Sequence, residues 1–210
     1  MQTDGNFRTY SVKEKKRKTP YLKSECRLIV SHRSLPMILK FCKISNELFN
    51  KRVSITKNKH GQYVCRVYIR KLLKIFKKIN IIFTKAPAPP IWIKNSNVNF
   101  GAYLAGIIDG DGHVKLKRNK DRHIPQCAVI ISNGEPQHEL AKSIRDNLNC
   151  KVQIVKRTKK KRKGTWFELT FYISRKTNLL HVKRYVLPFI ALPHKRIRIR
   201  HKILLEGPVV

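Results

Sequence analysis

Two carboxylates stand two residues apart at the end of an apolar segment. Residues 103–112 read Tyr-Leu-Ala-Gly-Ile-Ile-Asp-Gly-Asp-Gly, so that Asp109 and Asp111 close the apolar run. Carboxylate and carbonyl oxygens are the ligands that hard divalent cations prefer in proteins. We therefore take Asp111 as the candidate catalytic and metal-binding residue, and we place Gly110 beside it in the metal site.

The apolar run ahead of these acids predicts a helix that packs against a second backbone. Ala105 and Gly106 have small side chains or none, so a partner helix could approach closely there. Gly110 and Gly112 favour a tight exit from the helix. A simpler interpretation is an ordinary buried helix followed by an Asp-Gly turn. The residues expected to face the partner helix are Leu104, Ala105, Gly106 and Ile108.

Residues 104–112 resemble the LAGLIDADG motif of homing endonucleases. They differ from it only at Ile107, where the motif has Leu, and at Gly110, where it has Ala. Both replacements are conservative in size, and the flanking Tyr103 and Val114 also fit the family. A match over consecutive positions is harder to reach by accident than a spaced glycine pattern.

The resemblance implies a function as well as a fold. It implies a site-specific endonuclease of the homing type that hydrolyses phosphodiester bonds in double-stranded DNA with Mg²⁺. In this family two motif helices pack side by side, and each delivers one acidic residue to a shared metal site. Two alternatives stay open: a non-catalytic nucleic-acid binder such as a group I intron RNA maturase, and an inactive truncated endonuclease.

The charge of the chain indicates a polyanionic partner. Lys and Arg number 47 against 12 for Asp and Glu, which gives a formal net charge of +35 over 210 residues. Phosphate backbones are the commonest polyanions that proteins bind. Because 41% of the residues are hydrophobic, a packed core is expected rather than a disordered basic arm. A structural RNA-binding protein would show the same charge.

The sequence shows no feature of a membrane or secreted protein. No apolar stretch is long enough to span a bilayer, and the N-terminus has no signal-peptide pattern. The five cysteines are scattered and form no Cys-x-x-Cys pair, which argues against a disulfide framework or a structural zinc site. We expect a reducing compartment, which would be the cytoplasm or nucleoid of a bacterium or an organelle matrix.

The chain repeats one pattern of elements. Residues 26–31 read Cys-Arg-Leu-Ile-Val-Ser, and residues 127–132 read Cys-Ala-Val-Ile-Ile-Ser. A helix, an alternating strand, a basic turn, a second strand and an apolar helix follow each run. This self-similarity predicts a tandem duplication, which the family resemblance also implies. The matched segments are 34–50, 53–55, 57–61, 63–69 and 72–79 in the first copy, and 135–149, 152–154, 159–164, 167–173 and 179–186 in the second.

A partial copy of the motif stands at the start of the chain. Residues 4–7, Asp-Gly-Asn-Phe, match residues 111–114, Asp-Gly-His-Val. We expect a first motif that lacks its helix, with Asp4 as the second catalytic and metal-binding acid. The alternative is a simple turn, since Asp-Gly is a common turn dipeptide. A motif helix without its partner would expose an apolar face, so we also expect self-association through it or dependence on upstream residues.

The expected fold is α+β. Two LAGLIDADG half-domains, each a curved antiparallel sheet backed by helices, would form a saddle over DNA. We expect the first repeat at residues 1–80 and the second, with its intact motif, at residues 99–210. The segment between them, residues 81–98, contains Ala-Pro-Ala-Pro-Pro and is expected to be a stiff linker.

One face of each predicted sheet carries long polar side chains. Arg and Lys can bond guanine edges and Gln can bond adenine when a β surface lies in the major groove. A merely solvated face is the alternative. The basic run 156–163 lies in a predicted turn and is better suited to gripping phosphates. The expected DNA contacts are Arg27, Arg66, Lys115, Lys117, Gln126, Gln153, Lys159 and Lys160.

The segment 187–196 resembles the family segment that brings a basic residue beside the metals. Lys195 is the candidate, with His194 as the second choice. Its charge would stabilise the transition state or position the attacking water. A lysine that merely holds the DNA backbone is an equally good interpretation.

Overall fold

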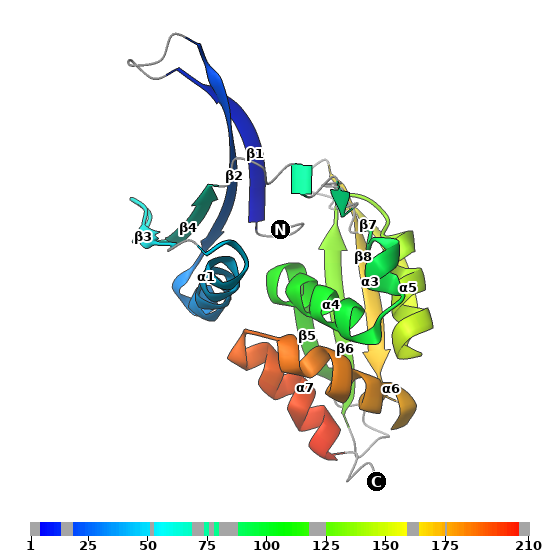
Figure 1. The fold of residues 1–210 in the computed structure, drawn as a ribbon. Coiled ribbons are helices and arrows are strands. Elements are labelled where there is room, and N and C mark those ends of the chain that lie inside the picture. Colours follow the sequence, from blue (N-terminus) through cyan, green and yellow to red (C-terminus); the bar gives the residue numbers. More distant parts are fainter. Residues whose placement is uncertain are drawn as a thin grey trace. The chain divides into compact units, whose positions relative to one another are not determined.

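The chain folds into two compact units, Met1–Phe83 and Thr84–Val210, each drawn with its elements in Figure 1. Each unit contains a four-stranded antiparallel sheet together with helices, which confirms the predicted α+β class. This computed structural model describes residues 5–13, 19–50, 53–68, 74–75, 78–79, 88–117, 125–158, 164–174 and 176–205.

The first unit is a sheet with the strand order β1-β2-β4-β3. Helix α1 packs on β2 and β4, and its Ile38 and Cys42 join Leu28 and Cys65 in a small buried cluster. Half of the predicted helix 72–79, namely positions 72–73 and 76–77, lies outside the described residues. The elements are β1 (Gly5–Val12), β2 (Tyr21–Val30), η1 (His32–Ser34), α1 (Leu35–Phe49), β3 (Ile55–Lys57) and β4 (Tyr63–Tyr68).

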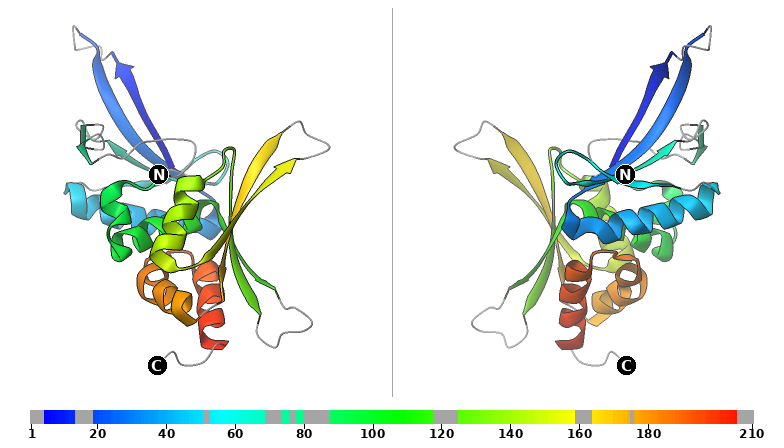
Figure 2. Two further views of the ribbon diagram at one scale, coloured as in Figure 1. Left: turned by 90° about the vertical axis from the view of Figure 1, so that its right-hand side faces the viewer. Right: turned by 90° about the vertical axis from the view of Figure 1, so that its left-hand side faces the viewer.

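The second unit is a sheet with the strand order β5-β6-β8-β7. Its helices gather on one side of the sheet, as Figure 2 shows, and none of the helices described for this unit lies on the other side. The elements are α3 (Ile91–Lys94), α4 (Asn97–Asp111), β5 (Gly112–Lys117), β6 (Gln126–Asn133), α5 (His138–Leu148), β7 (Lys151–Thr158), β8 (Thr165–Ile173), α6 (Lys176–His181), the π-helical turn η2 (Val182–Val186), η3 (Leu187–Phe189) and α7 (Pro193–Leu205).

The two sheets have the same strand order, and their registers correct the sequence alignment. Leu28 lies opposite Cys65 just as Ile131 lies opposite Leu169. The alignment of residues 26–31 with 127–132 is therefore wrong by two positions, because alternating apolar strands look alike after a shift of two residues. The register agrees with the match of Asp4-Gly5 to Asp111-Gly112. The corresponding rows are Gly5, Leu28, Cys65 and Ile55 in the first sheet and Gly112, Ile131, Leu169 and Ile154 in the second.

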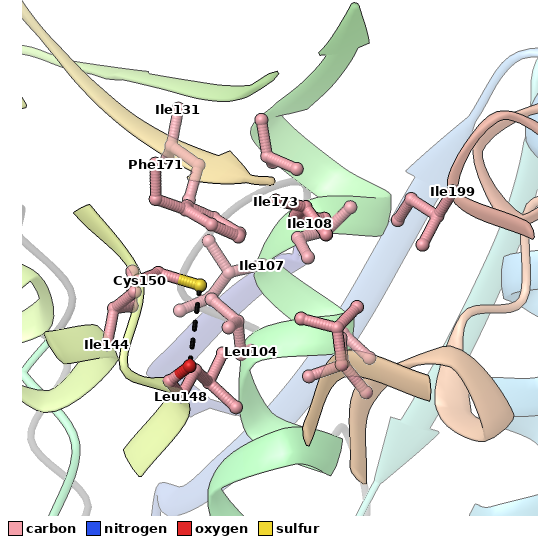
Figure 3. Packing of buried hydrophobic residues seen from close by; sticks show 14 of the residues in the cluster. Leu104, Ile107, Ile108, Ile131, Ile144, Leu148, Cys150, Phe171, Ile173 and Ile199 are labelled. Carbon is pink, nitrogen blue, oxygen red and sulfur yellow. Dashed lines mark hydrogen bonds between the residues drawn. The ribbon is translucent and has the colours of Figure 1, made fainter. Parts of the chain in front are cut away.

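Helix α4, which carries the motif, is buried against the sheet of its own unit. Leu104, Ala105 and Ile108 are 0%, 0% and 1% exposed, and they pack with residues of β6, β8 and α5 in the core that Figure 3 shows. The expectation that these three residues form an open face for a second helix is wrong. Only Gly106 of that predicted set is exposed. The 3.6-residue period of a helix places positions 104, 105 and 108 on the sheet side, and position 106 falls on the opposite side.

The start of α4 lies within the segment predicted as a linker. The side chain of Ser96 accepts a hydrogen bond from the backbone N–H of Asn99 (3.3 Å) and caps the helix. Helix α3 precedes this cap and buries Ile93 in the core of the second unit. Residues 81–87, at the start of the predicted linker, lie outside the described residues.

The described part of the chain contains no helix that could cross a membrane. All five cysteines are buried and free, so none takes part in a disulfide. Burial raises the pKa of the Cys127 thiol to about 12, and that of Cys150 likewise to about 12. These thiols are protonated at neutral pH and act as small apolar side chains.

Helix α4 also approaches the π-helical turn η2 very closely. A Cβ atom on Gly101 would lie 1.9 Å from the carbonyl oxygen of Tyr185, which is far inside van der Waals contact. Glycine is thus required at position 101 to let the two backbones touch. A Cβ on Gly106, in the same helix, would meet no atom within 4 Å.

Gly101→Ala is expected to lower the free energy of unfolding by about 1–3 kcal/mol, because α4 or η2 must shift to admit the methyl group. Gly106→Ala is the matched control, and it should raise the free energy of unfolding by about 0.5–1 kcal/mol, as alanine favours the helix. Urea denaturation of both variants measures the two effects. Equal stability of the two variants would show that the α4–η2 contact is not as close as described.

Candidate active site and nucleic-acid interface

The motif helix ends without a loop and passes directly into strand β5. Gly112 has φ −77° and ψ 136°, and its backbone N–H donates to the carbonyl groups of Ile107 and Ile108. A Cβ on Gly112 would lie 2.6 Å from the Cα and carbonyl oxygen of Ile108. The helix therefore needs glycine at position 112 because the backbone approaches Ile108 closely, and not because this residue has a left-handed conformation. Asp111, half-buried, is held at the last helical position and directly precedes the strand.

The carboxylate of Asp109 ties the end of α4 to the start of α7. It is 4% exposed, and it accepts hydrogen bonds from the backbone N–H groups of Ala191 (2.7 Å to Oδ2) and Leu192 (3.1 Å to Oδ1). Both N–H groups lie just before the first turn of α7, where a negative charge also interacts favourably with the helix dipole. Both oxygens of Asp109 are thus engaged in holding the fold.

Lys195 makes the reverse connection, from α7 back to α4. Its Nζ is buried and donates to the carbonyl oxygens of Ile108 and Asp109, both at 2.7 Å. These carbonyls belong to the last turn of α4, whose end favours a positive charge. These bonds place the ammonium at the end of the motif helix, and the catalytic role expected for Lys195 stays a prediction. His194, the second choice, is exposed.

The acids described in the structure do not by themselves complete a metal site. No cluster of three or more His, Cys, Asp or Glu side chains occurs among the described residues. Both oxygens of Asp109 bind backbone groups before α7, and Asp111 is the second acid of the motif, at the last position of α4. Gly110, whose carbonyl was predicted to bind metal, follows directly after the carbonyls that Lys195 holds. Asp4 lies outside the described residues.

The face of the second sheet that points away from its core is rich in basic side chains. Lys115 and Lys117 are exposed on β5, and Gln153 is exposed on β7 and accepts a hydrogen bond from the Tyr172 hydroxyl (3.3 Å). Gln126 is half-buried opposite Lys117. The structure therefore brings together these four predicted contacts on one face. Lys159 and Lys160 lie outside the described residues.

The first sheet places its two predicted contacts side by side. Arg27 and Arg66 are directly opposite each other on β2 and β4. Like charges in this position repel, so the pair suits a surface that meets an anion. Glu25, buried on the same face, forms an ion pair with Arg66 (3.7 Å from Nε to Oε1).

Sequence reasoning missed the position of Lys151 and Arg157 on the face of the second sheet that carries Gln153. Lys151 lies opposite Tyr172, and Arg157 lies opposite Trp166. The basic run 156–163 looked like a single turn, but β7 continues to Thr158. The alternation of β7 could have shown that Arg157 shares a face with Gln153.

Residues 101–187 match the model of a family described as a LAGLIDADG-like domain, and the resemblance that the motif indicated is confirmed over this segment. No curated protein sequence matches the chain.

The fold is similar to those of several solved structures. The meganuclease I-SmaMI bound to uncleavable DNA is 16% identical, with 98% of this chain and 88% of that chain covered and a TM-score of 0.57. I-DmoI in complex with DNA and Ca is 15% identical, with 92% and 90% covered and a TM-score of 0.54. The LAGLIDADG homing endonuclease I-GzeII in complex with its DNA target is 14% identical, with 95% and 84% covered and a TM-score of 0.52. The chain therefore has the fold of LAGLIDADG homing endonucleases.

Lys195→Met is expected to lower the free energy of unfolding by about 1–3 kcal/mol, because it removes a charged donor from two carbonyl groups in the last turn of α4. Arg196→Met removes the exposed cation next to it and should change the free energy of unfolding by no more than about 0.5 kcal/mol. Chemical denaturation of the two variants makes the comparison. If both lose the same stability, Lys195 does not hold the end of the motif helix.

Proposed function

We propose that this protein is a DNA endonuclease of the homing type, which hydrolyses phosphodiester bonds in double-stranded DNA at a specific site. The observation that carries the proposal is the position of Asp111. This carboxylate ends a helix whose last turn is fixed from two sides, and the next residues form strand β5, which exposes Lys115 and Lys117. The relatives of known structure were solved in complexes with DNA, which supports the same partner for this chain.

Duplex DNA is the partner that the sheet surfaces fit. The second sheet presents Lys115, Gln153 and Arg157 away from its core, and the first sheet presents Arg27 and Arg66. Surfaces of β-strands with such side chains can enter a major groove. Lysines near the strand ends would hold phosphates, which positions the duplex without reading its sequence. The net charge of +35 further favours a partner with many phosphates.

Asp111 and Asp4 are the acids that we propose as ligands of a divalent cation, with the carbonyl of Gly110 beside them. We propose Mg²⁺, whose preference for oxygen ligands this donor set satisfies. When bound, Mg²⁺ would activate the attacking water and stabilise the leaving 3′ oxygen of the scissile bond. Calcium occurs in the DNA complex of I-DmoI, which supports a divalent cation in a protein of this fold.

The other residues of the site position these ligands. Asp109 and Lys195 hold the last turn of α4 in place, so that Asp111 keeps one position relative to β5. We therefore propose Lys195 as a positioning residue. A catalytic carboxylate gains most when its surroundings are preorganised before the substrate binds.

Asp111→Asn is expected to reduce Mg²⁺-dependent cleavage about a hundredfold or more, equivalent to about 2.7 kcal/mol of transition-state stabilisation, while DNA affinity stays unchanged. A target is first enriched from a random duplex library and cloned into a plasmid, and nicking and linearisation are then followed on gels. Asp146→Asn, on the exposed side of α5, is the matched control and should cleave normally. Cleavage by Asp111→Asn at the wild-type rate would remove Asp111 from the metal site. Tight binding without cleavage by the wild type would favour the non-catalytic nucleic-acid binder.

DNA binding is expected to weaken steeply with salt. If at least about six phosphates are neutralised, affinity should fall about a thousandfold between 50 and 200 mM salt, because condensed counterions are released on binding. The double variant Lys115→Gln, Lys117→Gln should reduce the slope of log K against log salt by about one unit for each phosphate that these lysines neutralise in the wild type. Fluorescence anisotropy of a labelled duplex gives both slopes. A slope near zero for the wild type would contradict a backbone-binding mode.

A further inference from the structure

One acid interrupts the basic face of the second sheet. Among the described strands β5, β6, β7 and β8, Glu168 is the only residue with a carboxylate. It stands on the face that also carries Lys115, Lys151 and Arg157. A negative charge on a surface that meets phosphates weakens binding to every DNA sequence. Glu168 is therefore expected to contribute something other than affinity for DNA.

Both oxygens of Glu168 are engaged by neighbours on the same face. Arg157 Nε donates to Oε2 (2.9 Å), and Trp166 Nε1 donates to Oε1 (3.3 Å). Arg157 and Trp166 are directly opposite each other across β7 and β8, so the carboxylate bridges a cross-strand pair. The Glu168 side chain is 24% exposed and that of Arg157 is 53% exposed. The acid is thus partly covered, and the guanidinium reaches beyond it.

The stability of the fold does not account for this arrangement. Ion pairs with an exposed partner contribute little, commonly less than about 1 kcal/mol. Phosphate binding does not require it either, since a lysine can hold a phosphate as a point charge and needs no acid to position it. A fixed guanidinium differs from a mobile one mainly in the geometry of what it can recognise.

Because Glu168 binds the Nε of Arg157, the guanidinium keeps only certain donors for a further partner. With Nε donated to the carboxylate, the two terminal nitrogens of the guanidinium remain as a planar fork at the tip of the side chain. Such a fork matches the O6 and N7 acceptors on the major-groove edge of guanine. Holding the side chain in advance also reduces the conformational entropy lost on binding.

We propose that Arg157 reads a guanine in the major groove and that Glu168, supported by Trp166, is the residue that positions it. This inference rests on the proposed function, since it requires the basic face to bind duplex DNA. Arg157 is then a specificity-determining residue, and Glu168 acts through Arg157 rather than through a base of its own. One bidentate contact discriminates by about 1–3 kcal/mol, which corresponds to about 5- to 150-fold between guanine and the other bases.

The test is a selection of bound duplexes from a random library with the purified full chain, followed by sequencing. The wild type is expected to enrich a consensus that contains a guanine read by Arg157. Arg157→Lys keeps the charge but lacks the fork, so it should lose the preference at that single base pair and retain the rest. Glu168→Gln should lower the same guanine preference several-fold while binding to unrelated DNA becomes tighter, because one negative charge is gone. Thermal unfolding by circular dichroism checks that the variants are folded.

Lys151→Gln, on the same strand and face, is the matched control. It should weaken binding to all sequences alike and leave the consensus unchanged, as expected for a phosphate contact. A consensus unchanged in folded Arg157→Lys and Glu168→Gln would overturn this inference and leave the proposed function standing. A wild type that enriches no sequence would overturn the proposed function and this inference with it.

Discussion

The reciprocal contact between helices α4 and α7 is the interaction on which the site depends. Asp109 at the end of α4 accepts hydrogen bonds from the backbone N–H groups that precede α7. Lys195 of α7 donates hydrogen bonds to carbonyl groups in the last turn of α4. Each helix therefore provides a hydrogen-bonding side chain to backbone groups at the end of the other helix. The charges also have the signs that the helix dipoles favour. Asp111 follows this contact by two residues, so its position is set by buried bonds rather than by a flexible turn.

Two glycines make this geometry sterically possible. Gly101 lets α4 lie against the carbonyl group of Tyr185, and Gly112 lets β5 begin within van der Waals contact of Ile108. The apolar side of α4 packs in the core of its own unit, where Leu104 and Ile108 are fully buried. The carboxylate of Asp111 is thus joined to a basic strand by one glycine. The proposed functional surface therefore begins where the buried helix α4 ends.

Several features were predictable because they depend on local patterns. The motif at residues 104–112 indicated the family whose model matches residues 101–187, and the alternation of the strands predicted the polar face with Lys115 and Gln153. Other features depend on contacts between segments far apart in the chain. The bonds of Lys195 to Ile108 and Asp109 join residues more than 80 positions apart, and no spacing in the sequence signals them. The burial of Leu104 was misjudged because a helix with apolar residues on several sides fits both a sheet and a partner helix.

The central claim is that Asp111 holds a divalent cation in the complex with DNA, and mapping the cation by local oxidation tests it most directly. Fe²⁺ replaces Mg²⁺ in the enzyme–DNA complex, and ascorbate with peroxide generates radicals that cut the polypeptide next to the bound ion. Cuts are expected close to residues 109–112 and near Asp4, and they should be suppressed by excess Mg²⁺ and abolished in Asp111→Asn. Cuts at other positions only, or a pattern that Asp111→Asn leaves unchanged, would contradict the claim.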